Sequence, residues 1–368
     1  MQTLRQLKGD ARAVMLRATV PAGGRAVRFY SPSLSLGQIL VGLVIVGSLA
    51  CGQTAPIASG GPSSPAPSST ASPNATLTPT AAPTAANYAA PPARMAAALM
   101  RTGPTGGFLM FGGKAGQGPG SNLSDSWLWD GHGWTQLHPP TSPPATQAPI
   151  MAFDEGRQIG VLLSVQDGGT VQTWIWDGRG WSQRFPTTEP AAAPSSATYD
   201  AALSAVVVHS FKGTWLWTGE NWTVVNTATN PTALGGSYSL VYDPKARLLV
   251  LYGSPTIPTT LQSEVWTFDG RDWSAVSPSS GPSASSIQMT YSARQSMIIA
   301  LSAVGQTWGW NGVAWTSLGA PEARLANRVG IAMASDSLGN VMTFGGRDPQ
   351  ATFNDTWSWD NAGWSLKG

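Results

Sequence analysis

The sequence predicts an all-β fold of six four-stranded antiparallel units, and two observations support this. A motif of two aromatic residues separated by one position, followed five residues later by Trp, recurs six times and contains all 17 tryptophans. Only Phe268 replaces Trp in its aromatic slots. The closing tryptophans lie 41 to 51 residues apart, at Trp134, Trp181, Trp222, Trp273, Trp315 and Trp364. That period is typical of β-propeller blades and not of helical solenoids. Six units predict six blades.

The fourth unit shows the expected strands most clearly. We expect strands at 238–242, 247–252, 265–268 and 273–276, because these short segments are rich in β-branched and aromatic residues. Asp269-Gly270 separates the last two, and Asp-Gly favours a hairpin turn because these residues accept positive φ angles. Four of the six units carry Asp-Gly or Asn-Gly at this position.

The tryptophans are interpreted as packing residues. Residues two apart on a strand point to the same side, so both indoles of the third strand and the indole of the fourth lie on one face of a blade. Stacked blades would bury these rings, each of which brings roughly 150–250 Å² of surface. The alternative is that they form carbohydrate-stacking platforms, which need one or two exposed rings and not 17 in register.

Two segments carry a family resemblance. LMFGG at 109–113 and VMTFGG at 341–346 each end a predicted strand, and each is followed by an Asp-x-Trp strand, at Asp125 and Asp355. With the closing Trp, these features resemble a divergent kelch-type propeller, similar to the central domain of galactose oxidase, over residues 91–368. The resemblance implies a closed ring of blades. The Gly-Gly doublet is reduced or lost in the other four units. Unless residues 85–90 add a strand, no blade is shared between the chain ends.

The first 51 residues are expected to export and anchor the protein. Residues 1–32 carry six Lys and Arg against Asp10, and a run of apolar residues at 39–50 ends at Cys51, the only cysteine. Residues 33–51 are therefore interpreted as a signal peptide or a transmembrane signal anchor. The position of Cys51 resembles a bacterial lipoprotein signal, which implies lipidation there. A cleaved signal without lipidation, which would secrete the protein, is the third alternative. All three place the propeller outside the cytoplasm, and the first two place it on the extracytoplasmic face of the cell membrane.

Residues 52–90 are expected to be a disordered tether. They consist mainly of Ser, Pro, Thr, Ala and Gly without any charged residue, and such a tract cannot bury enough apolar area to offset its ordering entropy. Residues 91–368 contain 15 Lys and Arg against 18 Asp and Glu. The domain is therefore slightly acidic, and nothing in it predicts a nucleic-acid partner.

The sequence predicts no catalytic residue, no metal site and no cofactor. The three histidines, His132, His138 and His209, show no ligand spacing. The resemblance to galactose oxidase would imply a copper site with a Tyr–Cys crosslink, and residues 91–368 contain no Cys. The aspartates that end predicted first strands, Asp154, Asp200 and Asp243, are interpreted as turn caps and not as paired catalytic carboxylates.

A binding site is best sought in the long loops of units one and six, because function concentrates in loops on rigid scaffolds. These units are neighbours in a closed ring, so their loops would form one rim. The candidate contacts are Lys114, Asn122, Arg347, Asp348 and Phe353. The sequence thus predicts an extracytoplasmic, membrane-tethered propeller that acts as a ligand-binding or protein-interaction scaffold, with an extracellular protein or glycan as its partner. The alternative is a carbohydrate-binding or carbohydrate-active propeller, for which fold analogy alone is a weak argument.

Overall fold

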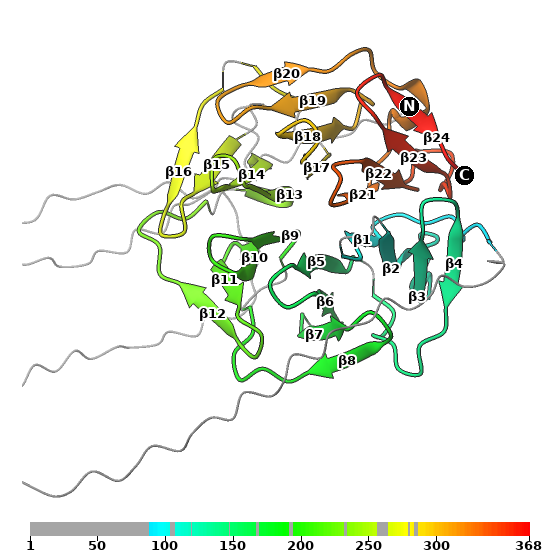
Figure 1. Ribbon diagram of the computed structural model, residues 1–368, viewed down its shortest axis with the longest axis horizontal. Helices are drawn as coiled ribbons and strands as arrows, with labels where there is room; N and C mark the ends of the chain where they lie inside the picture. The colour runs from blue at the N-terminus through cyan, green and yellow to red at the C-terminus, as the bar shows by residue number, and fades with distance from the viewer. Residues whose placement is uncertain are drawn as a thin grey trace, which may run out of the picture. The chain divides into compact units, whose positions relative to one another are not determined.

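The computed structural model describes residues 88–368, apart from 104–106, 119, 147, 167–168, 191–193, 232–233, 256–263, 279 and 283–285. These residues form an all-β ring of six sheets, each with four antiparallel strands in chain order (Figure 1). The predicted fold class and number of blades are confirmed. One 3-10 helix, η1 (Ala323–Leu325), is the only helix in the described part.

The first three blades follow one another along the chain. Blade 1 contains β1 (Ala98–Arg101), β2 (Phe108–Lys114), β3 (Asn122–Trp129) and β4 (Trp134–Leu137). Blade 2 contains β5 (Ile150–Asp154), β6 (Ile159–Val165), β7 (Val171–Trp176) and β8 (Trp181–Arg184). Blade 3 contains β9 (Ala197–Asp200), β10 (Ala205–Ser210), β11 (Gly213–Trp217) and β12 (Trp222–Val225).

The other three blades repeat this order. Blade 4 contains β13 (Leu234–Asp243), β14 (Leu248–Pro255), β15 (Glu264–Phe268) and β16 (Trp273–Val276). Blade 5 contains β17 (Ile287–Ser292), β18 (Met297–Ser302), β19 (Thr307–Trp310) and β20 (Trp315–Ser317). Blade 6 contains β21 (Ala332–Ser335), β22 (Val341–Phe344), β23 (Thr356–Trp359) and β24 (Trp364–Leu366).

The first strand of every blade lies next to the centre of the ring, and the fourth strand lies at the periphery (Figure 1). The strand order gives the ring two ends. The loops from second to third strands and from one blade to the next open at one end, called the loop end below. The turns from first to second strands and from third to fourth strands lie at the other end, called the turn end.

The turns between third and fourth strands form as the sequence predicts. Asp130 Oδ1 accepts hydrogen bonds from the N–H groups of His132 and Gly133, and Asp269 caps its turn in the same way. Gly131 has φ +100°, a region that favours glycine. The sixth blade uses Asn361 at the equivalent position, with φ +85°.

Tryptophans from each blade pack against the preceding blade. Trp174, Trp176 and Trp181 share a buried cluster with Leu109 and Phe111 of blade 1. No tryptophan is exposed: 13 are buried and the remaining four are half-buried. The packing interpretation is therefore confirmed, and the indoles leave no exposed stacking platform.

The closing tryptophans also tie the blades together by hydrogen bonds. Trp134 Nε1 donates to Thr356 Oγ1 across the junction of blades 6 and 1 at 2.8 Å. Five of the six closing indoles donate to a Ser or Thr hydroxyl of the preceding blade, namely Thr356, Ser126, Thr173, Thr214 and Thr307. The exception is Trp315. In the preceding blade, Val265 stands at the position that holds Ser or Thr in the other blades, and the buried Trp315 Nε1 has no acceptor among the described residues.

The ring closes without a shared strand. Segment 94–96 instead bridges the junction by backbone hydrogen bonds: Arg94 N to Phe353 O at 2.9 Å, Gly346 N to Arg94 O at 2.9 Å, and Ala96 N to Gly330 O at 2.7 Å. Residues 88–90 form no strand, although Ala89 N donates to Trp134 O at 2.9 Å.

The Gly-Gly doublets belong to this closure. Arg94 is fully buried and bonds both oxygens of Asp125, at 2.7 and 2.8 Å, and the carbonyl of Gly112. Arg328 repeats the set with Asp355 and Gly345. Gly345 has φ +66°, and a Cβ there would lie 2.4 Å from the Arg94 carbonyl oxygen. Glycine is thus required where the bridging segment passes.

Residues 1–87 lie outside the described part, so Cys51, the predicted anchor at 33–51 and the tether over 52–87 stay predictions. Residues 88–90, assigned to the end of the tether, contact blade 1, where the Tyr88 hydroxyl donates to Asp130 Oδ2 at 2.8 Å. Within the described part, no helix has the length and apolar character needed to cross a membrane.

Candidate functional site

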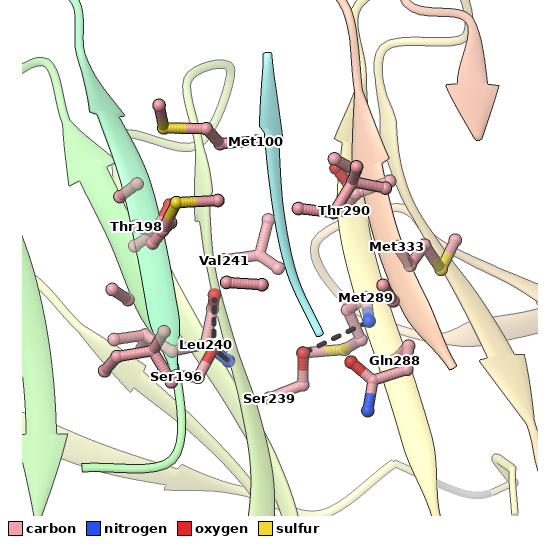
Figure 2. Close-up of a pocket in the computed structure, with 18 of the residues that line it drawn as sticks. Met100, Ser196, Thr198, Ser239, Leu240, Val241, Gln288, Met289, Thr290 and Met333 are labelled. Carbon is pink, nitrogen blue, oxygen red and sulfur yellow. Dashed lines mark hydrogen bonds between the residues drawn. The ribbon is translucent and has the colours of Figure 1, made fainter. Parts of the chain in front are cut away.

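A cavity of about 1250 Å³ occupies the centre of the ring. Its wall is formed by the first strands of all six blades, β1, β5, β9, β13, β17 and β21, together with residues at both ends. Figure 2 shows side chains from these strands around it. Small-molecule pockets usually span about 300–1,000 Å³. This channel therefore has room for a ligand of several rings.

One arc of the wall, over blades 3 to 5, is rich in hydroxyl groups, and those of blades 3 and 4 cap the neighbouring strand edge. Leu240 N donates to Ser196 Oγ at 3.1 Å, and Met289 N donates to Ser239 Oγ at 3.1 Å (Figure 2). A first strand pairs only with the second strand of its blade. The N–H and C=O groups of alternate residues therefore point away from that partner and toward the channel. The hydroxyls satisfy these groups on β13 and β17.

The other arc, over blades 6, 1 and 2, is apolar. Ile150 and Ala152 precede Asp154 by four and two residues, as Ser196 and Thr198 precede Asp200. Ala98 and Met100 hold the corresponding positions in blade 1. No side chain among the described residues caps the strand edge that follows these positions. The two arcs thus differ in how their backbone polar groups are satisfied.

The mouth at the loop end carries neutral polar groups and one exposed aromatic ring. Asn122, Gln166 and Gln288 line it with amides. Phe211, in the tight turn between β10 and β11, lines it with a ring that is 60% exposed. Lys212 Nζ lies 5.3 Å from the centre of this ring. A mouth that carries both an exposed ring and amides suits a ligand that has apolar C–H faces and hydroxyl groups.

The mouth at the turn end carries charged groups. Arg101 pairs with Glu155 and lies over the ring of Phe153, with 5.1 Å between the guanidinium carbon and the ring centre. Tyr242 and Tyr291 occupy the position of Phe153 in blades 4 and 5. Burial raises the pKa of the Tyr242 phenol, and the nearby Asp200 carboxylate raises it further. This end is therefore less suited to a neutral ligand.

The predicted turn-cap role of the first-strand aspartates is confirmed. Asp200 Oδ1 accepts from Ala202 N and Leu203 N, and Asp243 Oδ1 accepts from Lys245 N and Ala246 N. Asp154 accepts from Arg157 N in the same way. These carboxylates are buried and sit on separate blades.

The histidines are not brought together. His132 and His138 are exposed, and His209 is buried at the junction of blades 3 and 4. Its Nδ1 lies 3.0 Å from Thr214 Oγ1 and its Nε2 lies 3.3 Å from Pro231 O. Burial lowers the pKa of His209 to about 4. Among the described residues, no three His, Cys, Asp or Glu side chains are placed to hold a metal ion.

The five predicted loop residues lie mainly around the ring closure. Lys114 pairs with Asn122 across β2 and β3, and its backbone also bonds Met95 at 2.8 and 2.9 Å. Of the five, only Asn122 lines the channel.

The blade 6 candidates are engaged locally. Phe353 O accepts from the bridging segment, and the Arg328 guanidinium lies 3.5 Å from the centre of its ring. Arg347 pairs with Val329 through its backbone, and Asp348 Oδ1 accepts from Gln350 N and Ala351 N. The ligand contacts of these five residues stay predictions.

Sequence reasoning missed Phe211 and the channel arcs. Phe211 follows a buried strand within a short turn, and its only sequence signal is a large aromatic residue outside the repeated motif. The arcs are visible in the sequence as Ser and Thr before Asp200 where Ile and Ala precede Asp154. Their meaning depends on which strand edge each side chain meets.

Comparison with solved structures supports the fold. The SapL1 lectin in complex with alpha methyl fucoside is similar with a TM-score of 0.51 at 16% identity, over 75% of this chain and 95% of that one. The Aleuria aurantia lectin, described as a six-bladed β-propeller with a novel fucose recognition mode, is similar with a TM-score of 0.51 at 14% identity, over 75% and 97% of the two chains. At such identities the likeness shows the fold alone.

No protein-family model matches the sequence, and neither does any curated protein. The kelch resemblance therefore stays a prediction, while the six-bladed ring is confirmed.

Proposed function

We propose that this protein is a carbohydrate-binding propeller that takes a neutral oligosaccharide at the loop-end mouth of its central channel. The observation that carries the proposal is that the exposed ring of Phe211 and the amides of Gln166 and Gln288 line the same mouth of the channel. Sugars present C–H faces that pack on aromatic rings and hydroxyls that bond amides. The two solved structures described above are lectins, one of them with a fucoside bound, which supports a sugar ligand for this ring.

The sequence favours a protein-interaction scaffold as its first interpretation, and one observation still supports it. Val304 and Val329 are exposed in loop-end segments of blades 5 and 6, and exposed apolar side chains at one end of the ring are surface that a protein partner could cover. The two functions differ in what the loop end retains, so one experiment separates them.

The test is a glycan array probed with the full chain, beside envelope extract analysed by mass spectrometry. We expect retention of a defined neutral glycan, weakened about tenfold by Phe211→Ala because the aromatic contact contributes about 1 kcal/mol or more. Phe185→Ala is the matched control, since Phe185 is 82% exposed and does not line the channel. Equal binding by both variants, or retention of a protein without any glycan, would contradict the proposal.

The proposal includes display on the outer face of the cell membrane through the N-terminal segment. Cys51→Ser distinguishes its two forms. A lipid-anchored protein would carry labelled fatty acid and lose it on this change, whereas a protein held by an uncleaved anchor at 33–51 would carry none in either form. Recovery of wild-type protein in the cytoplasm would contradict both forms.

A further inference from the structure

We infer that the apolar arc of the channel holds a sugar through main-chain groups, at the strand edges that no side chain caps. The inference rests on the proposed function, because it names where and how the same ligand is held below the mouth. It starts from a difference between the first strands: side chains cap the channel-facing backbone groups of β13 and β17 but not those of β1, β5 and β9.

The register shows which backbone groups face the channel. Leu240 lies three residues before Asp243, and its N–H is bonded by Ser196 from the channel side. Ala197 and Met151 lie three residues before Asp200 and Asp154, on strands with the same pairing. In β1, Thr102 N donates to Gly107 O of its own blade. Leu99 lies three residues before Thr102, so its N–H and C=O groups also face the channel. All three residues line the channel.

These three residues have N–H and C=O groups without a capping side chain in the described part of the chain. Main-chain polar groups away from bulk water require a partner. In blades 4 and 5 that partner is a serine hydroxyl of the preceding blade. On β1, β5 and β9 the partner has to come from inside the channel, as water or as ligand.

A sugar fits this surface better than an ion or an apolar molecule. Each hydroxyl both donates and accepts, so it complements an N–H and a C=O side by side. The walls between the open edges are apolar, with Met100, Met151 and Ile150 lining the channel, and they would pack against C–H faces. The charged residues that line the channel, Arg101, Glu155 and Asp336, lie at the turn end.

Ile150 provides a single-site test. Ile150→Ser places a hydroxyl where Ser196 sits relative to Leu240, and so caps the Ala197 edge. Ile150→Ala removes the same bulk without adding a hydroxyl and is the matched control. The reciprocal change, Ser196→Ala, uncovers the Leu240 edge without touching the apolar arc. Thermal unfolding of each variant shows whether it is folded.

The measurement is a titration of the full chain in detergent, labelled with ¹³C at the methionine methyl groups, with methyl α-fucoside and cellotriose as probes. Met100 and Met151 line the apolar arc, whereas Met297 does not line the channel and serves as reference. We expect one probe to shift the signals of Met100 and Met151 and to leave the Met297 signal unchanged. Ile150→Ser should then weaken its binding about tenfold relative to Ile150→Ala, and Ser196→Ala should leave it unchanged.

The outcomes separate this inference from the proposed function. If a probe binds and is lost on Phe211→Ala, but Ile150→Ser and Ile150→Ala bind it equally, the sugar-binding function stands and the main-chain site is wrong. If neither probe shifts a methionine signal and no glycan is retained on the array, both are wrong.

Discussion

The junction between blades 6 and 1 and the junction between blades 3 and 4 are held in different ways. At the first, the backbone of segment 94–96 bonds blade 6 while the Arg94 side chain is buried against Asp125. At the second, side chains carry the contacts: Ser196 and Thr198 cap β13, and His209 packs against Trp273 with ring centres 5.1 Å apart. Both have one indole–hydroxyl bond.

The difference follows from chain connectivity. Blades 3 and 4 are linked covalently, so side-chain packing is enough to orient them. Blades 6 and 1 hold the two ends of the ring, and separating them exposes both faces at once. Backbone hydrogen bonds fix register without depending on side-chain identity. The Gly-Gly doublets survive in those two blades because the bridging backbone passes too close for a Cβ.

The largest expected effect comes from Arg94→Met. It leaves the Asp125 carboxylate, which is only 19% exposed, without its partner, and removal of one member of a buried ion pair costs about 3–5 kcal/mol. Burial by itself raises the pKa of Asp125, but the hydrogen bonds and charge of Arg94 outweigh it and hold this pKa below its usual value. Urea unfolding at neutral pH measures the loss.

Arg328→Met is the control, because it breaks the same set of bonds within blade 6. If closure depends on Arg94, the Arg94 variant loses more stability than this control. Equal losses would show that the guanidinium acts only within its own blade.

The next effect is a pH dependence at the junction of blades 3 and 4. His209 has a folded pKa of about 4 because burial disfavours its charge, against 6.5 in the unfolded chain. The unfolded state therefore binds more protons between these values, and stability falls as pH drops from 6.5 to 4, by roughly 3 kcal/mol. Urea unfolding across this range should show the loss, and His209→Gln should remove it. An unchanged slope in that variant would assign the titration elsewhere.

A smaller effect is expected from Thr173→Val at the junction of blades 2 and 3. The change leaves the buried Trp222 Nε1 without its acceptor, which lies 2.9 Å away, and an unsatisfied buried donor costs about 1–3 kcal/mol. Thr173→Ser keeps the hydroxyl and should lose less. Thermal unfolding of the pair measures the difference, and equal melting temperatures would mean that this bond contributes nothing net.

The smallest effect is a gain. Val265→Thr supplies the hydroxyl that Trp315 lacks at the junction of blades 4 and 5. We expect about 0.5–1.5 kcal/mol of added stability. In a Trp315→Phe background the same change should give no gain, and urea unfolding of the four variants closes the cycle. A gain that persists without the indole would refute the hydrogen-bond explanation.

The repeats allowed much of the fold to be predicted. The strand expected at 273–276 is found there as β16, whereas the one expected at 238–242 extends to Leu234–Asp243 as β13, with a register irregularity between Leu234 and Tyr238. Strand interiors are set by local alternation. Strand ends depend on partners that local sequence does not specify.

The candidate site was predicted less well. The loops of blades 1 and 6 were chosen for length, and most of the chosen residues contribute to ring closure. Asn122 alone of the five lines the channel, and Phe211 lies in a turn too short to be chosen. The length of a loop indicates how freely its sequence can vary. It does not show whether the loop contacts a ligand or packs against a neighbouring blade.

The sequence by itself determined that the chain has six blades, where their turns lie and why the tryptophans are buried, because each depends on residues at fixed short spacing. Only the tertiary structure decided how the ring closes and which first-strand edges are left open to the channel. Those features depend on contacts between residues on different blades, such as Arg94 with Phe353 and Ser196 with Leu240. A strand's own sequence cannot show which neighbour supplies a hydroxyl to its edge.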